Sequence, residues 1–210
     1  SCDLHCFGGF VLTEHYGVVR STIDVDVVDI RGADIADIAR RAGRGSPLHR
    51  RHRAYVDVVT IAEIPDDYES RLIDMKVGGL THLRLLAFER HDLVLAKLAR
   101  NTDRDREDVV ALALGPGLDT DVLRSRYRDE LRPTLGRPDR EDLTLELWIE
   151  MILEITGEAP TSSATPVIGA KNPATRSKFR PVLHSDAAPA STHQLCRSDE
   201  SDRIAHANRA

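Results

Sequence analysis

The stretch Ser21-Thr22-Ile23-Asp24-Val25-Asp26-Val27-Val28 decides how the fold of this 210-residue chain is interpreted. Its β-branched residues are typical of a strand, which we expect over 22–30. Residues two apart on a strand point to the same face about 6.6 Å apart, so Asp24 and Asp26 share one face. The other face is filled by Ile23, Val25 and Val27. The pattern predicts a buried strand that carries half of a metal site.

A second alternating stretch, 54–60, supplies a third carboxylate. Asp57 stands there between two valines, and neighbouring strands lie about 4.8 Å apart, so it can complete a triad with Asp24 and Asp26. Like charges repel by about 4 kcal/mol per pair at 4 Å and an effective dielectric near 20, which favours a cation between them. The triad suits two Mg²⁺ or Mn²⁺ ions. The alternative is a set of aspartates on a solvated sheet edge.

Paired glycines precede the aspartate strand. Gly8-Gly9 lies between an expected strand over 4–7 and a short expected helix through 11–15. Residues without a Cβ let backbone N–H groups approach a phosphate at the start of a helix. We interpret the pair as a phosphate-binding turn, and the alternative is a tight strand-to-helix turn.

Short strands and helical patterns alternate up to about residue 88, and the later pattern is helical. This order favours an α/β or α+β domain followed by a helical segment. We expect a helix over 35–42 that ends at Gly43, and a third strand over 82–88. Further helices are expected through Leu93, Ala96, Lys97 and Arg100, through 109–113, through 122–127 and over about 139–155. In the last helix the expected core stripe is Leu143, Leu147, Trp148, Met151, Ile152 and Ile155.

The last quarter of the chain differs in composition. From Gly157 onward prolines interrupt every short apolar run, and helical or alternating periodicity disappears. We therefore predict one domain over 1–156, with a sheet part over about 1–88 and a helical part over about 89–156. The segment 157–210 is expected to be a low-complexity, disordered tail.

Composition excludes several classes of protein. The net charge of -5 argues against coating of nucleic acid, and we expect no DNA partner. No apolar run is long enough to span a membrane, and no signal peptide is visible, so a cytoplasmic location and no membrane partner are expected. Three cysteines are too few for a disulfide framework, and a zinc site at Cys2, His5 and Cys6 fits no common spacing.

Two groups of basic residues have an open interpretation. Lys97 and Arg100, followed by Arg104 and Arg106, can neutralise a triphosphate. The alternative is a solvated surface with local ion pairs such as Arg104 to Asp108. The arginine-rich stretch 40–53 can receive RNA or another polyanionic acceptor, but no aromatic residue is interleaved to stack bases, and an exposed loop is the alternative.

These motifs together resemble a known superfamily. The runs Phe7-Gly8-Gly9, Asp24-Val25-Asp26 and Val56-Asp57-Val58 resemble the signature of the DNA polymerase β-like nucleotidyltransferases. The longer context, in 20–22, 91–98 and 104–108, is similar to small, minimal nucleotidyltransferase-like prokaryotic members, some of which act in toxin–antitoxin systems. The resemblance covers about 4–155 and implies an α+β fold, in which helices flank a small mixed β-sheet and a C-terminal helical region follows.

The resemblance also implies roles for individual residues. Asp24 and Asp26 are expected to bind Mg²⁺ or Mn²⁺, and Asp57 to bind one ion and act as general base. The nucleotide is expected to contact Gly8, Gly9, Arg20, Thr22, Lys97 and Arg100. The chain departs from the pattern at Gly9, where many active members carry serine.

The implied reaction transfers a nucleoside monophosphate from an NTP to a hydroxyl of a protein or RNA acceptor, with a neighbouring-gene product as a further partner. One alternative is a catalytically silent nucleotide-binding or regulatory module. Another is a metal-dependent phosphodiesterase.

Overall fold

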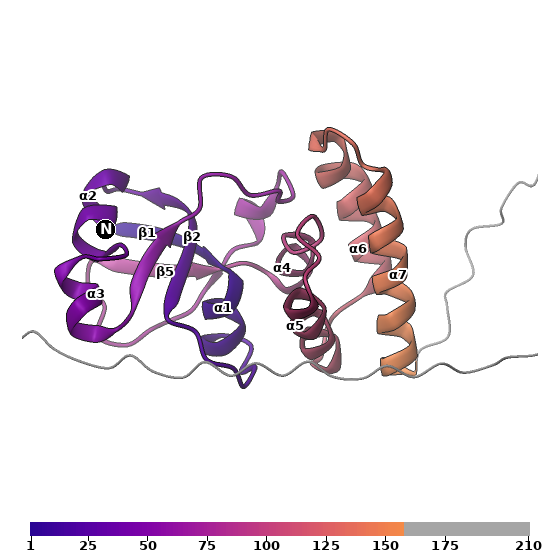
Figure 1. Cartoon of the computed structure of the whole chain (residues 1–210), viewed down its shortest axis with the longest axis horizontal. Coiled ribbons are helices and arrows are strands. Elements are labelled where there is room, and N and C mark those ends of the chain that lie inside the picture. The colour runs from indigo at the N-terminus through magenta and orange to yellow at the C-terminus, as the bar shows by residue number, and fades with distance from the viewer. Residues whose placement is uncertain (158–210) are drawn as a thin grey trace, which may run out of the picture. The chain divides into compact units, whose positions relative to one another are not determined.

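The structure, a computed structural model, describes residues 1–157, in which a mixed β-sheet is followed by a group of helices (Figure 1). The expected mixed sheet with flanking helices and a C-terminal helical region is confirmed. The prediction of a disordered tail falls on 158–210 and so lies almost entirely outside the described residues. The strands are β1 (Cys2–Phe7), β2 (Asp24–Arg31), β3 (Tyr55–Val58), β4 (Ile73–Asp74) and β5 (Leu83–Ala87). The helices of the sheet part are α1 (Gly8–Glu14), α2 (Ile35–Ala42), α3 (Pro47–His52) and the 3-10 turn η1 (Tyr68–Arg71).

The sheet order β3-β2-β1-β5-β4 places β1 in the centre and β3 at an edge. β1 pairs antiparallel with β2 and parallel with β5, while β4 pairs antiparallel with β5. β2 and β3 are parallel and are joined through α2 and α3. Their register pairs Asp24 with Tyr55 and Asp26 with Asp57. The three aspartates therefore come from two neighbouring strands, as the sequence predicts.

A β-bulge interrupts β2. His5 pairs with Asp29 and Cys6 pairs with Val27, so Val28 is an extra residue in β2. An extra residue shifts the alternation of the side chains that follow it. Asp26 and Asp29, three residues apart, therefore face the same side of the sheet.

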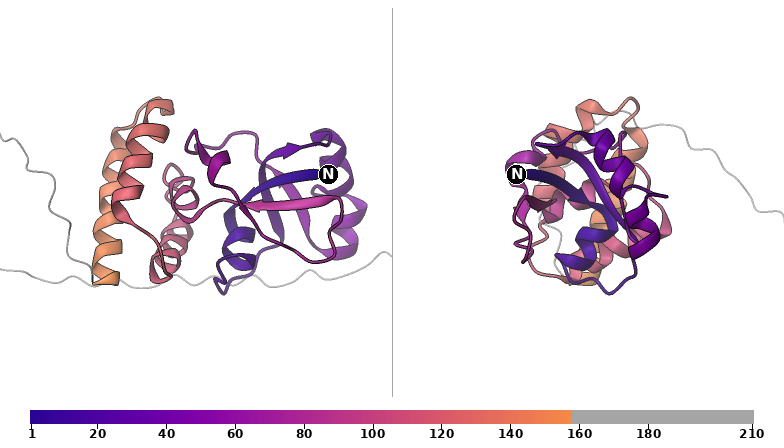
Figure 2. Two further views of the ribbon diagram at one scale, coloured as in Figure 1. Left: turned by 180° about the vertical axis from the view of Figure 1, so that it is seen from behind. Right: turned by 90° about the vertical axis from the view of Figure 1, so that its left-hand side faces the viewer.

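The helical part begins after β5. It consists of α4 (Arg90–Leu95), α5 (Asp103–Leu114), α6 (Thr120–Arg126), the π-helical turn η2 (Tyr127–Leu131), the 3-10 turn η3 (Arg132–Thr134) and α7 (Asp139–Thr156). These helices lie together on one side of the sheet, and α2 and α3 lie on the opposite side (Figures 1 and 2). No helix among residues 1–157 is long and apolar enough to cross a membrane.

The expected helix through Leu93 and Arg100 is wrong in its second half. α4 ends at Leu95, and the chain continues through turns to Asn101, whose φ of 43° is left-handed. Thr102 then caps α5 in a capping box with Asp105. Leu93, Val94, Leu95 and Leu98 are all buried. A run of apolar residues followed by basic ones is compatible with one long helix and also with a short helix followed by turns. The sequence pattern therefore could not distinguish these two structures.

α7 is confirmed as a helix, but the expected core stripe is partly wrong. Trp148 and Ile152 are buried, whereas Leu143 and Leu147 are 64% and 54% exposed. The buried face also includes Leu145 and Ile149 and packs against α5. Apolar residues of this helix occur on more than one of its faces. Helical spacing alone therefore does not tell which face packs against a neighbouring element.

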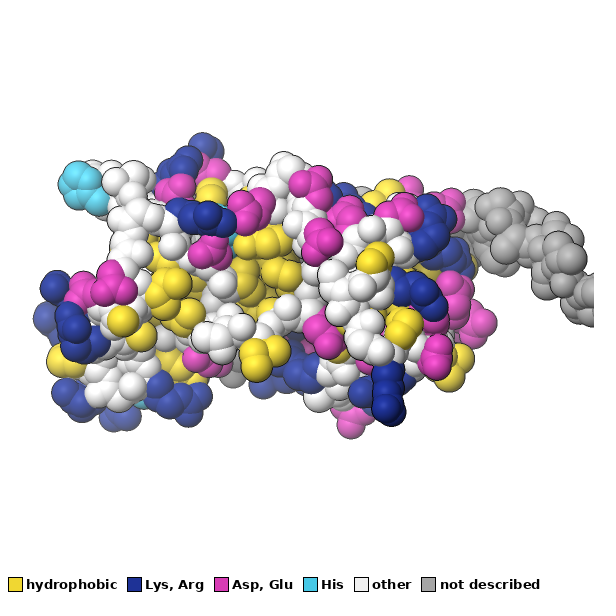
Figure 3. All heavy atoms as spheres, turned by 90° about the horizontal axis from the view of Figure 1, so that it is seen from above, with side chains coloured by type: hydrophobic (Ala, Val, Ile, Leu, Met, Phe, Trp, Pro, Cys, Tyr) yellow, Lys and Arg dark blue, Asp and Glu magenta, His cyan; other side chains and the backbone are white. Residues whose placement is uncertain are grey.

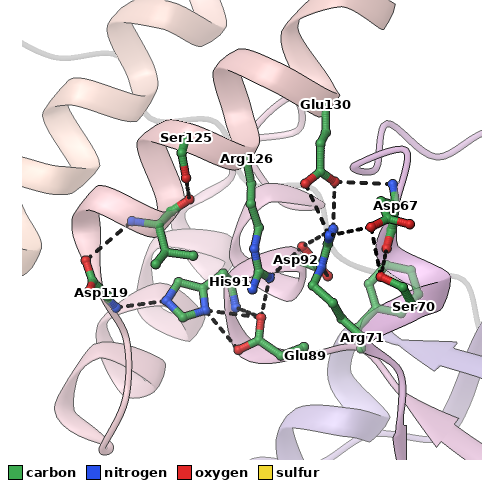
Figure 4. A network of polar contacts seen from close by, with 12 residues as sticks. Asp67, Ser70, Arg71, Glu89, His91, Asp92, Asp119, Ser125, Arg126 and Glu130 are labelled. Carbon is green, nitrogen blue, oxygen red and sulfur yellow. Dashed lines mark hydrogen bonds and ion pairs between the residues drawn. The ribbon is translucent and has the colours of Figure 1, made fainter.

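A group of ion pairs, which we call the Asp92 network, joins η1 to the helical part (Figure 4). Asp92 is fully buried and accepts hydrogen bonds from Arg71 Nε at 2.8 Å and from Arg126 at 2.9 Å. Glu130, in the π-helical turn, accepts from Arg71 at 2.7 Å, and Glu89 also pairs with Arg126. Each of the three carboxylates in this network therefore has a guanidinium partner.

His91 extends the Asp92 network to α6. Its Nε2 accepts the backbone N–H of Asp119 at 2.9 Å, so that nitrogen carries no proton. Nδ1 then carries the proton and donates it to Glu89 at 2.8 Å. The imidazole is thus held in one orientation between the start of α4 and the cap of α6.

Candidate functional site

The three predicted aspartates meet on one face of the sheet. Asp24, Asp26 and Asp57 each offer a carboxylate oxygen, and these atoms lie within 4.8 Å of one another. The in-register pairing of Asp26 with Asp57, and the spacing of two between Asp24 and Asp26, produce this cluster. We call it the aspartate triad.

The absence of a side chain at Gly8 leaves room for the triad. The φ of Gly8 is 67°, a left-handed conformation that favours glycine, and a Cβ here would overlap the carboxylate of Asp26. The next N–H, of Gly9, donates a hydrogen bond to Asp26. The paired glycines therefore let α1 begin directly against the aspartate strand. Their contact with a phosphate stays a prediction.

The charge of the triad is not balanced within the part of the chain that the structure describes. None of the three carboxylates forms an ion pair with a lysine or arginine within residues 1–157, and Asp24 accepts only from the hydroxyl of Thr22, at 2.7 Å. Burial and the charges of Asp24 and Asp57 raise the pKa of Asp26, although the Gly9 N–H opposes this. Closely spaced carboxylate oxygens are the ligands that Mg²⁺ and Mn²⁺ prefer. The residues present therefore fit a divalent cation.

Two cavities meet at the triad and share Asp26, Lys97 and Arg100. The larger, about 550 Å³, is lined by Gly9, Arg20, Thr22 and Asp24 as well. The smaller, about 360 Å³, is lined by Gly8, Ile61 and Leu93. Clefts of about 300–1,000 Å³ are typical of small-molecule sites. All nine predicted site residues except Asp57 line one or both cavities, and Asp57 adjoins them through the triad.

Lys97 lies in a turn after α4 and is 3% exposed. Its Nζ is 2.7 Å from a carboxylate oxygen of Asp108 and 3.4 Å from one of Asp105. An ammonium group has three donors, so one remains for a group in the cavities. Two acidic residues of α5 therefore hold this lysine at the cavity wall.

Asp105 and Asp108 also position the two arginines. Arg100 donates to both oxygens of Asp105, from Nε at 2.8 Å, and Arg20 pairs with Asp108. Burial alone would raise the pKa of Asp105, but the hydrogen bonds from Arg100 and Thr102 and the charge of Lys97 bring that pKa well below its usual value. Sequence reasoning did not assign this role to either acid. The Thr102-x-x-Asp105 capping pattern was the available signal, because it fixes the start of the helix that presents both.

The other predicted basic residues have different positions. Arg104 lines the larger cavity and donates to the backbone carbonyl of Ser21 at 3.2 Å. The ion pair between Arg104 and Asp108, named under the alternative of a solvated surface, does not form, since Asp108 pairs with Arg20 and Lys97 instead. Arg106 bonds to Asn101 at 3.0 Å and lines neither cavity.

The hydroxyl of Thr22 lies beside Gly9. A Cβ built on Gly9 would be 3.1 Å from Thr22 Oγ1 and 3.2 Å from a guanidinium nitrogen of Arg20. A serine at this position would therefore direct its side chain into space that the Thr22 hydroxyl already borders. The departure from serine at position 9 thus leaves a hydroxyl group at this wall of the larger cavity.

A second group of possible metal ligands, His5, Asp29 and Glu69, lies on the same face. Here Arg31 pairs with both carboxylates, at 2.7 Å to Glu69. His5 Nδ1 is 3.2 Å from the hydroxyl of Tyr68. A guanidinium already supplies the positive charge in this group, so it lacks the unbalanced charge of the aspartate triad.

Comparison with known proteins agrees with this geometry. No curated protein and no solved structure matches the chain. The model of one protein family matches residues 2–150, a span that includes the triad, both glycines and the basic residues of the cavities. The chain therefore belongs to that family, which is described as "Nucleotidyltransferase of unknown function (DUF6036)".

Proposed function

We propose that this protein transfers a nucleoside monophosphate from an NTP to a hydroxyl acceptor, and that the transfer requires Mg²⁺ or Mn²⁺. One observation carries the proposal. Three carboxylates lie within 4.8 Å of one another without an ion-pair partner among the described residues, at the junction of two cavities that also contain Lys97 and Arg100. Membership of a nucleotidyltransferase family supports it.

Each side chain has a task in this reaction. Asp24, Asp26 and Asp57 would hold the divalent ions, which when bound neutralise phosphate charge and polarise the reacting oxygens. Lys97 and Arg100 would pair with the phosphates, because ammonium and guanidinium groups in a partly buried site bind them strongly. Both groups are already held by acids of α5, so little conformational entropy is lost when the nucleotide binds.

Asp57 is proposed as the general base. It takes the proton of the acceptor hydroxyl as that oxygen forms a bond to the α-phosphorus. The bond from the α-phosphorus to the bridging oxygen breaks, and pyrophosphate leaves. Asp57 is suited to this because β3 is an edge strand, so an acceptor can approach it from outside the sheet.

The proposal is tested with purified protein and each of the four NTPs labelled at the α-phosphate. Label should enter an acceptor fraction, RNA or protein, with Mg²⁺ or Mn²⁺ and not with EDTA. Asp57→Asn should abolish transfer while NTP binding remains. Equal transfer by the wild type, Asp24→Ala and Asp26→Ala would overturn the mechanism.

The presence of Gly9 instead of serine favours a second candidate, a silent nucleotide-binding or regulatory module. Such a module would bind NTP without turnover, and divalent ions need not tighten the binding. Calorimetry with a non-hydrolysable NTP analogue, with and without Mg²⁺, separates the two. A partner encoded by a neighbouring gene, as in toxin–antitoxin pairs, fits either candidate, and co-purification with that gene product tests it.

A further inference from the structure

Positive charge is concentrated in one segment. Residues 38–56 contain six arginines and no acidic residue, although the whole chain has a net charge of -5. Figure 3 shows Lys and Arg side chains gathered over α2 and α3, at the left of that view. The six are Arg40, Arg41, Arg44, Arg50, Arg51 and Arg53, which we call the arginine surface. All six are exposed.

Most of the arginine surface is not neutralised by residues 1–157. Arg40 and Arg41 share one acid, Asp37. The other four form no ion pair with any residue of 1–157. Arg51 and Arg53 form no side-chain hydrogen bond with this part of the chain either. Exposed arginines more often alternate with acids, so a cluster of this kind points to an anionic ligand.

The arginine surface borders the aspartate triad. α3 leads through Arg53 directly into β3, where the N–H of Tyr55 donates to the carbonyl of Ile23 at 3.1 Å. Tyr55 pairs with Asp24. Because Tyr55 lies two residues before Asp57, the two side chains point to the same face of β3. Four residues of chain span at most about 14 Å, which limits the separation of Arg53 and Asp57. The surface and the proposed general base therefore adjoin the same edge strand.

Contacts at Tyr55 hold this segment in place. The guanidinium of Arg44 lies 4.7 Å from the centroid of the Tyr55 ring, and the ring of His49 lies 4.9 Å from it. Arg53 has a left-handed φ of 58° and closes α3 with its N–H bonded to the carbonyl of His49. Arg51 and Arg53, whose guanidinium groups have no partner among residues 1–157, are thus presented by a helix end that is packed on the sheet.

We propose that the arginine surface binds the phosphodiester backbone of the acceptor, a nucleic-acid strand whose terminal hydroxyl is delivered to Asp57. This inference rests on the proposed function. Repeated phosphates match a cluster of guanidinium groups, each of which can bind a phosphate through two hydrogen bonds. No Phe, Trp or Tyr side chain is exposed among the arginines to stack bases, so recognition is of the backbone and is independent of sequence.

The first test measures binding alone. A fluorescent single-stranded RNA, with a DNA strand of the same sequence in a parallel arm, is titrated with the full chain over a range of KCl concentrations. Arg51→Glu with Arg53→Glu should weaken RNA binding at least tenfold. The slope of log affinity against log salt should fall by about 1.4, at about 0.7 for each phosphate that the variant no longer neutralises. Tighter binding of RNA or of DNA identifies the acceptor strand.

A matched control is available in Arg137→Glu with Arg140→Glu. These arginines are exposed and lie beside the start of α7, on the side of the sheet opposite α2 and α3 (Figure 1). The control removes the same charge and should leave binding within twofold of the wild type. Where the Arg51 and Arg53 glutamate variant does not fold, Arg51→Gln with Arg53→Gln gives the same test with a smaller change of charge.

Binding and transfer can fail separately. Asp57→Asn should bind the strand as the wild type does and transfer no label, so the arginine surface is tested even if the proposed transfer is wrong. Equal losses in the Arg51/Arg53 variant and the Arg137/Arg140 control would overturn the inference, as would an unchanged salt slope. Label that enters only a protein acceptor, with transfer unaffected in the Arg51/Arg53 variant, would overturn it as well.

Discussion

The aspartate triad and the Asp92 network use the same kind of acid in opposite ways. In the Asp92 network every carboxylate has an arginine partner, and Asp92 itself has two. In the triad no carboxylate has a basic partner among residues 1–157, and a backbone N–H and a hydroxyl are the donors. Both groups are at least partly buried.

The difference teaches how to separate acids that hold a fold together from acids that await a ligand. A buried carboxylate is tolerated when a guanidinium compensates the loss of hydration. Among residues 1–157 the triad has no such partner, and the proposed divalent ions would supply this compensation. Substitutions in each group test this division.

Removing one charge from the triad should affect activity and spare the fold. We expect Asp26→Asn to lower label transfer about a thousandfold, since metal ligation contributes several kcal/mol to the transition state. Its thermal midpoint should equal or exceed that of the wild type, because the burial and like-charge repulsion that raise the pKa of Asp26 no longer act on a charge. Transfer rates and melting curves give both values. Asp129→Asn, at an exposed pair with Arg128, is the control, and should change neither.

The same substitution in the Asp92 network should do the opposite. Asp92→Asn removes the fully buried charge that Arg71 and Arg126 share, although each arginine keeps a partner in Glu130 or Glu89, and breaking a buried pair costs about 3–5 kcal/mol. Urea unfolding should show this fall in the free energy of unfolding, while Asp57→Asn should show none. If both variants lost the same stability, the division between the two groups of acids would be wrong.

Divalent ions should stabilise the protein through the triad. Mg²⁺ at about one hundred times its dissociation constant should add about 2.7 kcal/mol to the free energy of unfolding. The gain should vanish in Asp24→Asn with Asp26→Asn and persist in Glu130→Gln, which alters only the Asp92 network. A thermal shift measured with and without EDTA decides between these results.

Acid should weaken the Asp92 network through Glu89. Burial would raise the pKa of Glu89, but hydrogen bonds from His91 and Arg126 hold that pKa at about 2, below the ordinary 4.5. Its folded pKa is depressed, so its stabilisation is present above pH 4.5 and is lost as the pH falls toward 2. At pH 3 the loss is about 2 kcal/mol relative to neutral pH. Unfolding measured from pH 5 to pH 3 should be flatter in Glu89→Gln, and an equally steep curve would contradict this assignment.

The smallest effect is expected at the wall of the larger cavity. Thr22→Ala should raise the KM for NTP about fivefold to tenfold. This change corresponds to the loss of one hydrogen bond, which contributes roughly 1 kcal/mol. Adding Gly9→Ser should recover most of the loss, because its side chain would enter the space that Thr22 borders. Steady-state kinetics of the two variants give the comparison. If the double variant is worse than Thr22→Ala, position 9 cannot take over from Thr22.

The triad could be predicted from the sequence because it depends on strand alternation alone. Asp24, Asp26 and Asp57 needed only a period of two and two neighbouring strands, and the register of β2 with β3 completed the cluster. Gly8 could be predicted in part, since its left-handed φ is local, whereas its lack of space depends on the packing of α1 against Asp26 of β2.

The anchoring of the basic residues could not be predicted, because it depends on tertiary packing. Lys97 is placed in the cavities as expected, but by turns held to Asp105 and Asp108 instead of by a helix. Those contacts join segments whose relative position no periodicity gives. The sequence predicted α7 as a helix. Which of its leucines are buried depends on the packing of α7 against α5.

The bulge at Val28 has a consequence for anyone who edits this strand. The bulge separates residues 24–27, which pair in register with β3, from residues 29–31, which pair with β1 from His5 toward its start. Deleting Val28 would remove the bulge and leave regular alternation, so that Asp26 and Asp29, then two residues apart, would still face the same side of the sheet. Substitutions can therefore be made in the two halves independently, whereas deletion of Val28 would remove the local bend and extra twist where the two halves meet.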